Sequence, residues 1–198
     1  MRGFNCANKA LAWLAEGQLR RFLVALLFSV WVSTGGAVMA DTPAPLEYPV
    51  KAAFLYKFAL YVEWPEDAFA TQVSPVIVGV IGPPELVDQV REAMHDRHLN
   101  GRPIEVRQVT RPDLNKFHLL FIARSAQANL EELLDPKARR PLLVVTEAPG
   151  ALEAGSVINF DVTDERVRFD VNLNSAGNRG LRVSAQLLNV ARTVQGAP

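Results

Sequence analysis

Cysteine is almost absent from this sequence, and its single copy, Cys6, lies in the N-terminal segment. If that segment is removed, the remaining chain has no disulfide, no thiol nucleophile and no cysteine ligand for zinc. Histidine is scarce too. His95 and His98 are close enough to share a helix face, but no third metal ligand lies near them in the sequence. We therefore predict no metal and no other cofactor.

Signatures of the common catalytic sites are also missing. There is no Walker-type phosphate loop and no Gly-x-Ser-x-Gly nucleophile elbow. The turn at residues 79–84 has two glycines but lacks the third glycine of the dinucleotide fingerprint. Carboxylates are scattered, so an acid/base pair would have to be assembled in space. The sequence predicts a protein that is not an enzyme, with a hydrolase as the less favoured alternative.

An excess of positive charge is missing as well. The chain has 21 basic and 21 acidic residues, a formal net charge of zero. Nucleic acids and anionic lipids attract proteins mainly through an excess of lysine and arginine. Composition therefore gives no electrostatic reason to expect either as a partner.

The N-terminus has the three-part layout of a secretory signal. Two arginines precede an uncharged apolar run at residues 22–32, and small residues follow, with Val38 and Ala40 at positions −3 and −1 of a cleavage site. A run of about 11 residues is short of the ~20 that span a bilayer as a helix. We predict that residues 1–40 are a signal peptide cleaved after Ala40 and that the protein works in the periplasm. The alternative is an uncleaved membrane anchor.

Cleavage would change the composition of the working protein. The mature chain would have 158 residues, a length that favours one domain with a hydrophobic core. Four basic residues and one acidic residue would leave, so that 17 basic and 20 acidic residues remain, a net charge of −3. Residues 41–47 contain two prolines, Pro43 and Pro45, and are predicted to form an extended leader before a domain at residues 48–194.

Hydrophobic patterning beyond the leader predicts alternating strands and helices. Short β-branched or apolar runs indicate buried strands, and apolar residues at three- and four-residue steps indicate helices. The fold class is therefore α/β, a single domain with a mostly parallel central sheet, helices on both faces and a C-terminal antiparallel hairpin. We expect strands at 76–81, 104–109, 119–122 and 142–145, a hairpin at 157–160 and 167–171, and helices at 48–64, 84–95, 127–134 and 181–194.

The first predicted helix is apolar on almost every side. Only Lys51, Lys57 and Glu63 interrupt its hydrophobic surface. A helix of this kind is either buried or docked to a partner, and it favours self-association. We predict that these three charged residues lie at a polar edge and orient a partner protein. Ion pairing with neighbouring residues is the alternative for Lys51 and Glu63.

A polar segment joins the last predicted strand to the last helix. Residues 172–181 concentrate amides, two glycines and one arginine. Such a segment can be a structural connection whose amides cap backbone groups, or a recognition surface at strand ends. On the second interpretation we predict that Asn172, Asn174 and Arg179 bind a partner through hydrogen bonds.

Two sequence blocks resemble the YfiR family of periplasmic regulators, the YfiR/HmsC-like group. One is YPVKAAFLYKFALYVEWP at residues 48–65, and the other is NLNSAGNRGLRVSAQLLNVA at residues 172–191. The resemblance extends over residues 48–194. It implies an α/β fold, a homodimer, and repression of an inner-membrane diguanylate cyclase by binding its periplasmic portion. Such repression lowers cyclic-di-GMP and the output of exopolysaccharide and biofilm.

One position departs from the family pattern. Members often carry cysteines, including one directly before the histidine that corresponds to His118. This chain has Phe117 there. The resemblance therefore does not carry control by disulfide state over to this protein.

A second functional hypothesis comes from the predicted topology instead of the resemblance. Ligand sites in open α/β sheets lie beyond the carboxyl ends of the parallel strands. A small-molecule-binding sensor module in the periplasm is therefore the alternative to a repressor of a cyclase.

Overall fold

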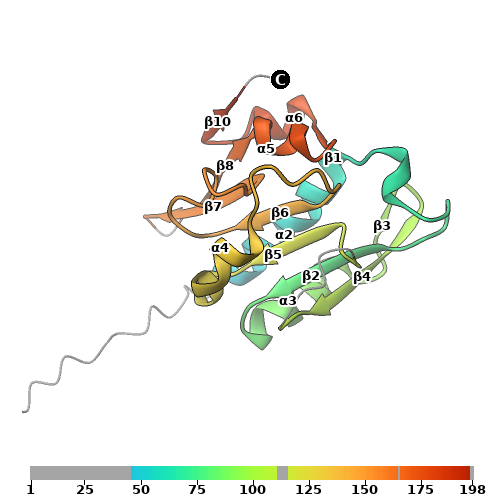
Figure 1. Cartoon of the computed structure of the whole chain (residues 1–198). Coiled ribbons are helices and arrows are strands. Elements are labelled where there is room, and N and C mark those ends of the chain that lie inside the picture. The colour runs from blue at the N-terminus through green and yellow to red at the C-terminus, as the bar shows by residue number, and fades with distance from the viewer. Residues whose placement is uncertain (1–45, 111–115, 165, 197–198) are drawn as a thin grey trace, which may run out of the picture. The chain divides into compact units, whose positions relative to one another are not determined.

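The computed structural model describes residues 46–110, 116–164 and 166–196 (Figure 1). The predicted signal peptide and residues 41–45 of the predicted leader lie outside these ranges. The first helix begins at Glu47, the last residue of that leader. Across the part of the chain that is described, no helix combines the length and the apolar character needed to cross a membrane.

A twisted eight-stranded sheet forms the centre of the described domain (Figure 1). Its strand order is β10-β8-β7-β6-β5-β2-β4-β3. Neighbouring strands from β4 to β7 are parallel, whereas β7 and β8 form an antiparallel hairpin. The strands are β2 (Val76–Ile81), β3 (His98–Leu99), β4 (Arg102–Gln108), β5 (Leu119–Ile122), β6 (Leu143–Thr146), β7 (Ile158–Thr163), β8 (Arg166–Asn172) and β10 (Thr193–Gln195).

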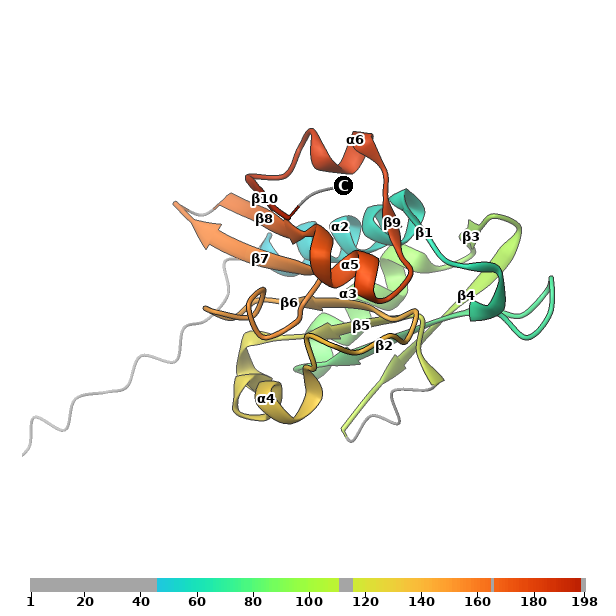
Figure 2. The ribbon, with the colours of Figure 1, turned by 45° about the horizontal axis from the view of Figure 1, so that its top comes forward.

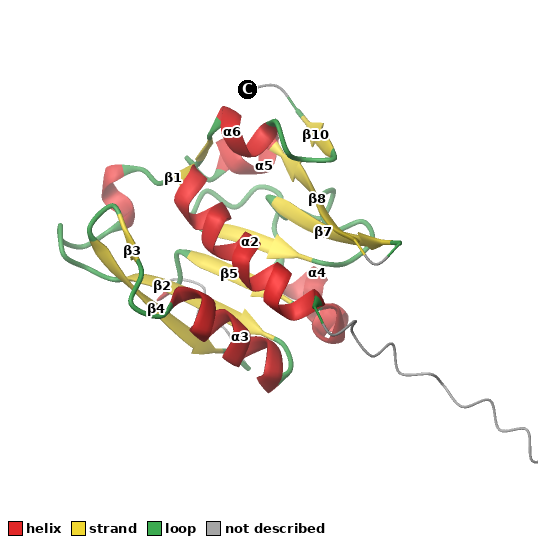
Figure 3. Cartoon of the chain, turned by 180° about the vertical axis from the view of Figure 1, so that it is seen from behind, coloured by secondary structure: helices red, strands yellow, loops and turns green. Residues whose placement is uncertain are grey.

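Helices cover the two faces of this sheet unequally. The long helix α2 (Glu47–Tyr61) and α3 (Pro84–Met94) lie side by side on one face, which Figure 3 shows from their side. The other face carries a 3₁₀ turn, η3 (Arg124–Asn129), and the single-turn helix α4 (Leu130–Leu133). The predicted α/β class, the mostly parallel sheet and the hairpin are confirmed.

The main core lies between the sheet and helix α2. Phe58 is fully buried, and its ring centre is 4.8 Å from that of Phe169 and 5.3 Å from that of Phe160. These two partners come from the hairpin strands β8 and β7, so aromatic packing fixes the helix across the hairpin. The buried face of α2 is centred on Lys51, Leu55 and Phe58, whereas Val50 is exposed.

A second, smaller core covers the other face of the sheet. It consists of aliphatic side chains from β5, β6 and the segments that follow them. Phe117 packs against its edge, and a Cβ atom built on Gly79 would lie only 2.8 Å from Cδ1 of the Phe117 ring. The phenylalanine thus occupies the space that glycine leaves on β2.

The C-terminal segment contradicts the predicted helix at 181–194. It contains the short strand β9 (Arg182–Val183), the single-turn helix α6 (Ala185–Leu188) and the edge strand β10. Strand β9 pairs with β1 (Val62–Glu63), and β10 pairs in parallel with β8. Backbone pairing with distant strands overrides the local helical pattern here, because each pairing satisfies polar groups that a short surface helix would leave to water.

Two further predictions need correction. Residues 172–181, expected to be a connection, contain helix α5 (Leu173–Asn178). The helix expected at 127–134 is divided into η3 and α4, since a 3₁₀ turn begins at Arg124 directly after β5. Both differences concern elements of one or two turns, for which side-chain periodicity carries little information.

His118 fastens the connection between α2 and β2 to the start of β5. Its Nδ1 atom accepts a hydrogen bond from the Ile77 N–H at 3.0 Å, and Nε2 donates to the Ala68 carbonyl at 3.1 Å. The imidazole stacks on the Phe69 ring, with ring centres 4.5 Å apart. The Arg102 guanidinium lies over the same Phe69 ring, 4.0 Å from its centre. A protonated ring would lose the bond from Ile77, because Nδ1 could no longer accept.

We expect low pH to weaken the hydrogen bonds that His118 makes. Burial is the main cause that lowers the pKa of His118 below its ordinary value of 6.5, and Arg102 lowers it further. Between the lower native pKa and pH 6.5, the imidazole of His118 is therefore protonated in the unfolded chain but neutral in the native protein. The free energy of unfolding should be insensitive to this group above pH 6.5, fall as the pH drops from 6.5 towards the lower native pKa, and level off below that pKa.

Urea unfolding of the wild type and of His118→Gln between pH 5 and 8 measures this contribution. The other two histidines, His95 and His98, are present in both proteins, so the difference between the two pH slopes isolates His118. Identical pH slopes in the two proteins would contradict the assignment.

Candidate functional site

Several exposed polar residues gather at the amino ends of the parallel strands. Helix α2 runs antiparallel to these strands, so its last turns, β1, β9 and α5 all meet there (Figure 2). Glu63 of β1 and Arg182 of β9 are paired in register and form an exposed ion pair, with 2.6 Å between Nη2 and Oε2. We call this region the amino-end surface; its exposed members are Lys57, Leu60, Glu63, Asn174 and Arg182.

Asn172 has a structural role at the start of α5. Its Oδ1 atom accepts the Ser175 N–H at 3.0 Å and so caps the helix, and its Nδ2 group donates to the Leu152 carbonyl at 3.0 Å. The helix ends before Gly180, whose φ of +69° suits glycine. Asn174, one residue into the helix, is exposed.

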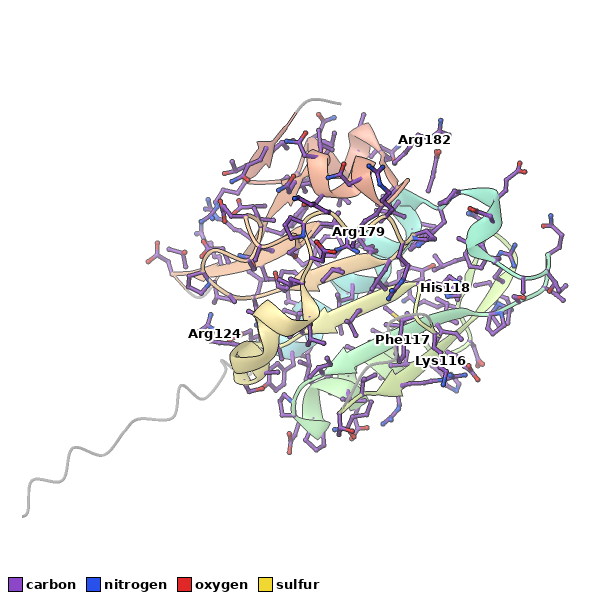
Figure 4. All side chains as sticks on the ribbon, in the orientation of Figure 1. Lys116, Phe117, His118, Arg124, Arg179 and Arg182 are labelled. Atoms are coloured by element: carbon purple, nitrogen blue, oxygen red, sulfur yellow. The ribbon has the colours of Figure 1, made fainter. Side chains whose placement is uncertain are left out.

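Arg179 points into the molecule. It is 4% exposed, and its Nη2 atom donates to the carbonyls of Asp135 and Gly155 at 3.2 and 3.3 Å (Figure 4). Burial is the main cause that lowers the pKa of its guanidinium. The side chain ties α5 to two loops of the same domain, so the structural interpretation of the late segment fits Arg179 and Asn172 better than direct recognition.

Lys51 lies at the opposite end of α2, near the carboxyl ends of the strands. It is 1% exposed and forms ion pairs with Glu147, directly after β6, and with Glu47, one turn earlier in the helix. The second Glu147 oxygen accepts the Arg124 N–H. We predicted that Lys51 lies at a polar edge of the helix, but it lies in the interior. Its ion pairs with Glu47 and Glu147 agree with the alternative prediction, in which Lys51 pairs with neighbouring residues.

The predicted residues thus separate into two groups. Lys57, Glu63 and Asn174 are exposed at the amino-end surface, whereas Lys51 and Arg179 are buried. Sequence reasoning missed Arg182, because its partner lies 119 residues away in the chain and leaves no local signal. It also missed Leu60, which periodicity alone cannot separate from the buried residues of an apolar helix.

A hollow of about 530 Å³ lies elsewhere on the domain, against β7 and β8. It begins at the carboxyl end of β6 and continues over the face of the hairpin that carries Asn159 and Asp170. This is close to the place where the second functional hypothesis puts a ligand. Among the described residues, no three histidine, cysteine or carboxylate side chains are grouped as a metal would require. The lining residues are Arg124, 147–153, 159–161, Asp170, Arg192 and Gln195.

The comparison with known families agrees with the sequence resemblance. A family model described as YfiR/HmsC-like matches residues 48–192, from the second residue of α2 to the residue before β10. The match includes both the amino-end surface and most of the sheet. Members of this family are regulators in the context of diguanylate cyclases and not catalysts. The chain belongs to the YfiR/HmsC-like family.

Proposed function

We propose that this protein is exported to the periplasm and represses an inner-membrane diguanylate cyclase by binding the cyclase's periplasmic portion. Repression would lower cyclic-di-GMP and, with it, exopolysaccharide and biofilm. The observation that carries the proposal is the family match across residues 48–192. The predicted signal peptide at residues 1–40 supports it, because export would bring the domain to the side of the membrane where such a sensor portion lies.

The amino-end surface is the binding region that we propose. Leu60 is 42% exposed on the last turn of α2, an apolar side chain surrounded by charged and amide groups. An apolar centre with a polar rim is the usual anatomy of a protein interface, in which arginine is enriched. The Glu63–Arg182 pair is exposed and contributes at most about 1 kcal/mol to folding, so both groups remain available to a partner.

The N-terminal half of α2 offers an adjoining surface for the homodimer that the family implies. Leu46 and Val50 are exposed at a four-residue spacing, and Ala53 continues the same stripe. This stripe continues along the same face of α2, where Ala53 is one turn from Lys57, so a dimer formed through it would border the proposed cyclase site. Self-association stays a prediction, and light scattering of each variant below would record it.

Substitutions at the amino-end surface test the proposal. Leu60→Asp and Glu63→Arg should each weaken binding to a purified cyclase periplasmic portion at least tenfold, which corresponds to about 1.4 kcal/mol, and raise cyclic-di-GMP in cells. Arg107→Glu is the matched control, since it reverses one charge of the exposed Glu105–Arg107 pair on β4, a strand of the eight-stranded sheet to which β9 does not belong. It should repress like the wild type.

The charge-swapped double variant Glu63→Arg/Arg182→Glu separates partner binding from an internal role. It restores the ion pair within the domain but presents each charge at the other's place. If the pair contacts the partner, the double variant should bind as poorly as Glu63→Arg. Full recovery in the double variant, or full repression by Leu60→Asp, would overturn the proposed surface.

A further inference from the structure

The hollow against the hairpin has the size of a small-molecule site. Its volume of about 530 Å³ lies within the roughly 300–1,000 Å³ that such sites occupy. One wall is the β7–β8 hairpin, where Asn159 and Asp170 face each other in register. The segment at 147–153 and the chain around β10 form the other walls. The amino-end surface contributes no residue to this lining.

Negative charge predominates inside the hollow. Arg124 and Arg192 are its only basic lining residues, and four carboxylates accompany them: Glu147, Glu153, Asp161 and Asp170. The guanidinium of Arg192 is shared, because it binds both oxygens of Asp170 and also pairs with Asp161. Lys51 behind the wall is shared in the same way between Glu147 and Glu47. Each cation thus leaves part of the carboxylate charge uncompensated.

The behaviour of Arg192 indicates that this environment stabilises positive charge. Its hydrogen bond to Asp170 is the main cause that raises the pKa of the guanidinium above its ordinary value. Asp170 is itself buried, and charges act more strongly on one another beside a low-dielectric wall than in open water. A second cation that enters the hollow would be attracted by the carboxylate charge that Arg192 does not neutralise.

A hydrogen-bond donor and an apolar surface complete the lining. The Asn159 Oδ1 atom accepts from Thr146 Oγ1 at 2.7 Å and from the Ala148 N–H at 3.0 Å, which fixes the orientation of the amide. Its Nδ2 group has no partner among the described residues and remains as a donor. Pro149 also lines the hollow, is exposed and can contact a carbon chain.

We propose that this hollow binds a small organic cation, a molecule with at least one protonated amino group on a short carbon skeleton. Glu153, Asp161 and Asp170 would accept its amino hydrogens, and Asn159 would donate to an oxygen where the molecule has one. The proposed repression of a cyclase does not require this site. The two proposals concern different surfaces of the domain.

Three probes of equal length test the chemistry of the site. Titration of the full mature chain with 1,4-diaminobutane, 1,4-butanediol and succinate compares a dication, a neutral molecule and a dianion on four-carbon chains. We expect the diamine to bind at least tenfold more tightly than the diol and succinate not to bind. NMR shifts should concentrate on residues 147–161 and around Arg192.

Variants locate the binding. Glu153→Gln and Asp161→Asn should each weaken the diamine at least tenfold, whereas Glu105→Gln on the distant strand β4 should leave it unchanged. Glu153 is exposed, so its variant tests the site even if Asp161→Asn disturbs the hairpin. Equal binding of diamine and diol, absence of diamine binding, or unchanged affinity in Glu153→Gln would overturn the proposal. Leu60→Asp should bind the diamine normally, which separates this site from the repressor surface.

Discussion

Replacing Lys51 with alanine should destabilise the domain by about 3–5 kcal/mol, because it leaves a buried carboxylate without its cation. Glu147 has only 4% of its side chain exposed, and Lys51 is its one oppositely charged partner among the described residues. The Arg124 N–H would still donate to it but carries no net charge. Urea unfolding monitored by circular dichroism measures the loss.

Two controls make this result interpretable. Lys57→Ala removes an exposed lysine from the same helix and should change the free energy of unfolding by no more than about 0.5 kcal/mol. The double variant Lys51→Met/Glu147→Leu removes both charges and should recover most of the stability lost in Lys51→Ala. A loss below about 1 kcal/mol in Lys51→Ala, the value for an exposed pair, would contradict a buried and obligatory ion pair.

Replacing Phe58 with alanine should cost a similar amount, about 3–5 kcal/mol. The ring is fully buried and packs against Phe54, Phe160 and Phe169, with ring centres 4.8–5.8 Å apart. Its removal leaves a cavity between α2 and the hairpin that rigid strands cannot close. Thermal and urea unfolding would measure the loss of stability.

The position of the ring on α2 supplies the control for this substitution. Leu60→Ala truncates an apolar side chain two positions further along the same helix, on its exposed side. This substitution should change the free energy of unfolding only slightly. Phe58→Leu keeps most of the buried volume and should lose clearly less than Phe58→Ala. Equal losses in Phe58→Ala and Leu60→Ala would mean that α2 does not pack by the face described above.

The regular part of the fold was predictable because its information is local. The β-branched run at 76–81 is strand β2 with the predicted bounds, and the apolar run at 119–122 is β5. Strands of this kind are buried on both faces, so an unbroken apolar run marks them wherever they lie in the sheet. The hairpin was predictable for a related reason, since its alternating strands flank a polar turn.

The candidate site was only partly predictable, because burial of charge depends on distant neighbours. Lys51 and Lys57 have the same side chain and lie on the same apolar helix, yet one is buried against Glu147, 96 residues away, and the other is exposed. Arg179 likewise becomes structural only because two loop carbonyls lie within its reach. No local pattern distinguishes these cases.

The sequence by itself determined the α/β class, the positions of the central strands along the chain and the family, since each is written in local patterning or in contiguous blocks. Only the tertiary structure decided which charges are internal, which form the amino-end surface and where the acidic hollow lies. It also replaced a predicted C-terminal helix with strands β9 and β10. The physical reason is common to all of these: the free energy of a buried charge or an edge strand is set by partners that the chain brings together only when it folds.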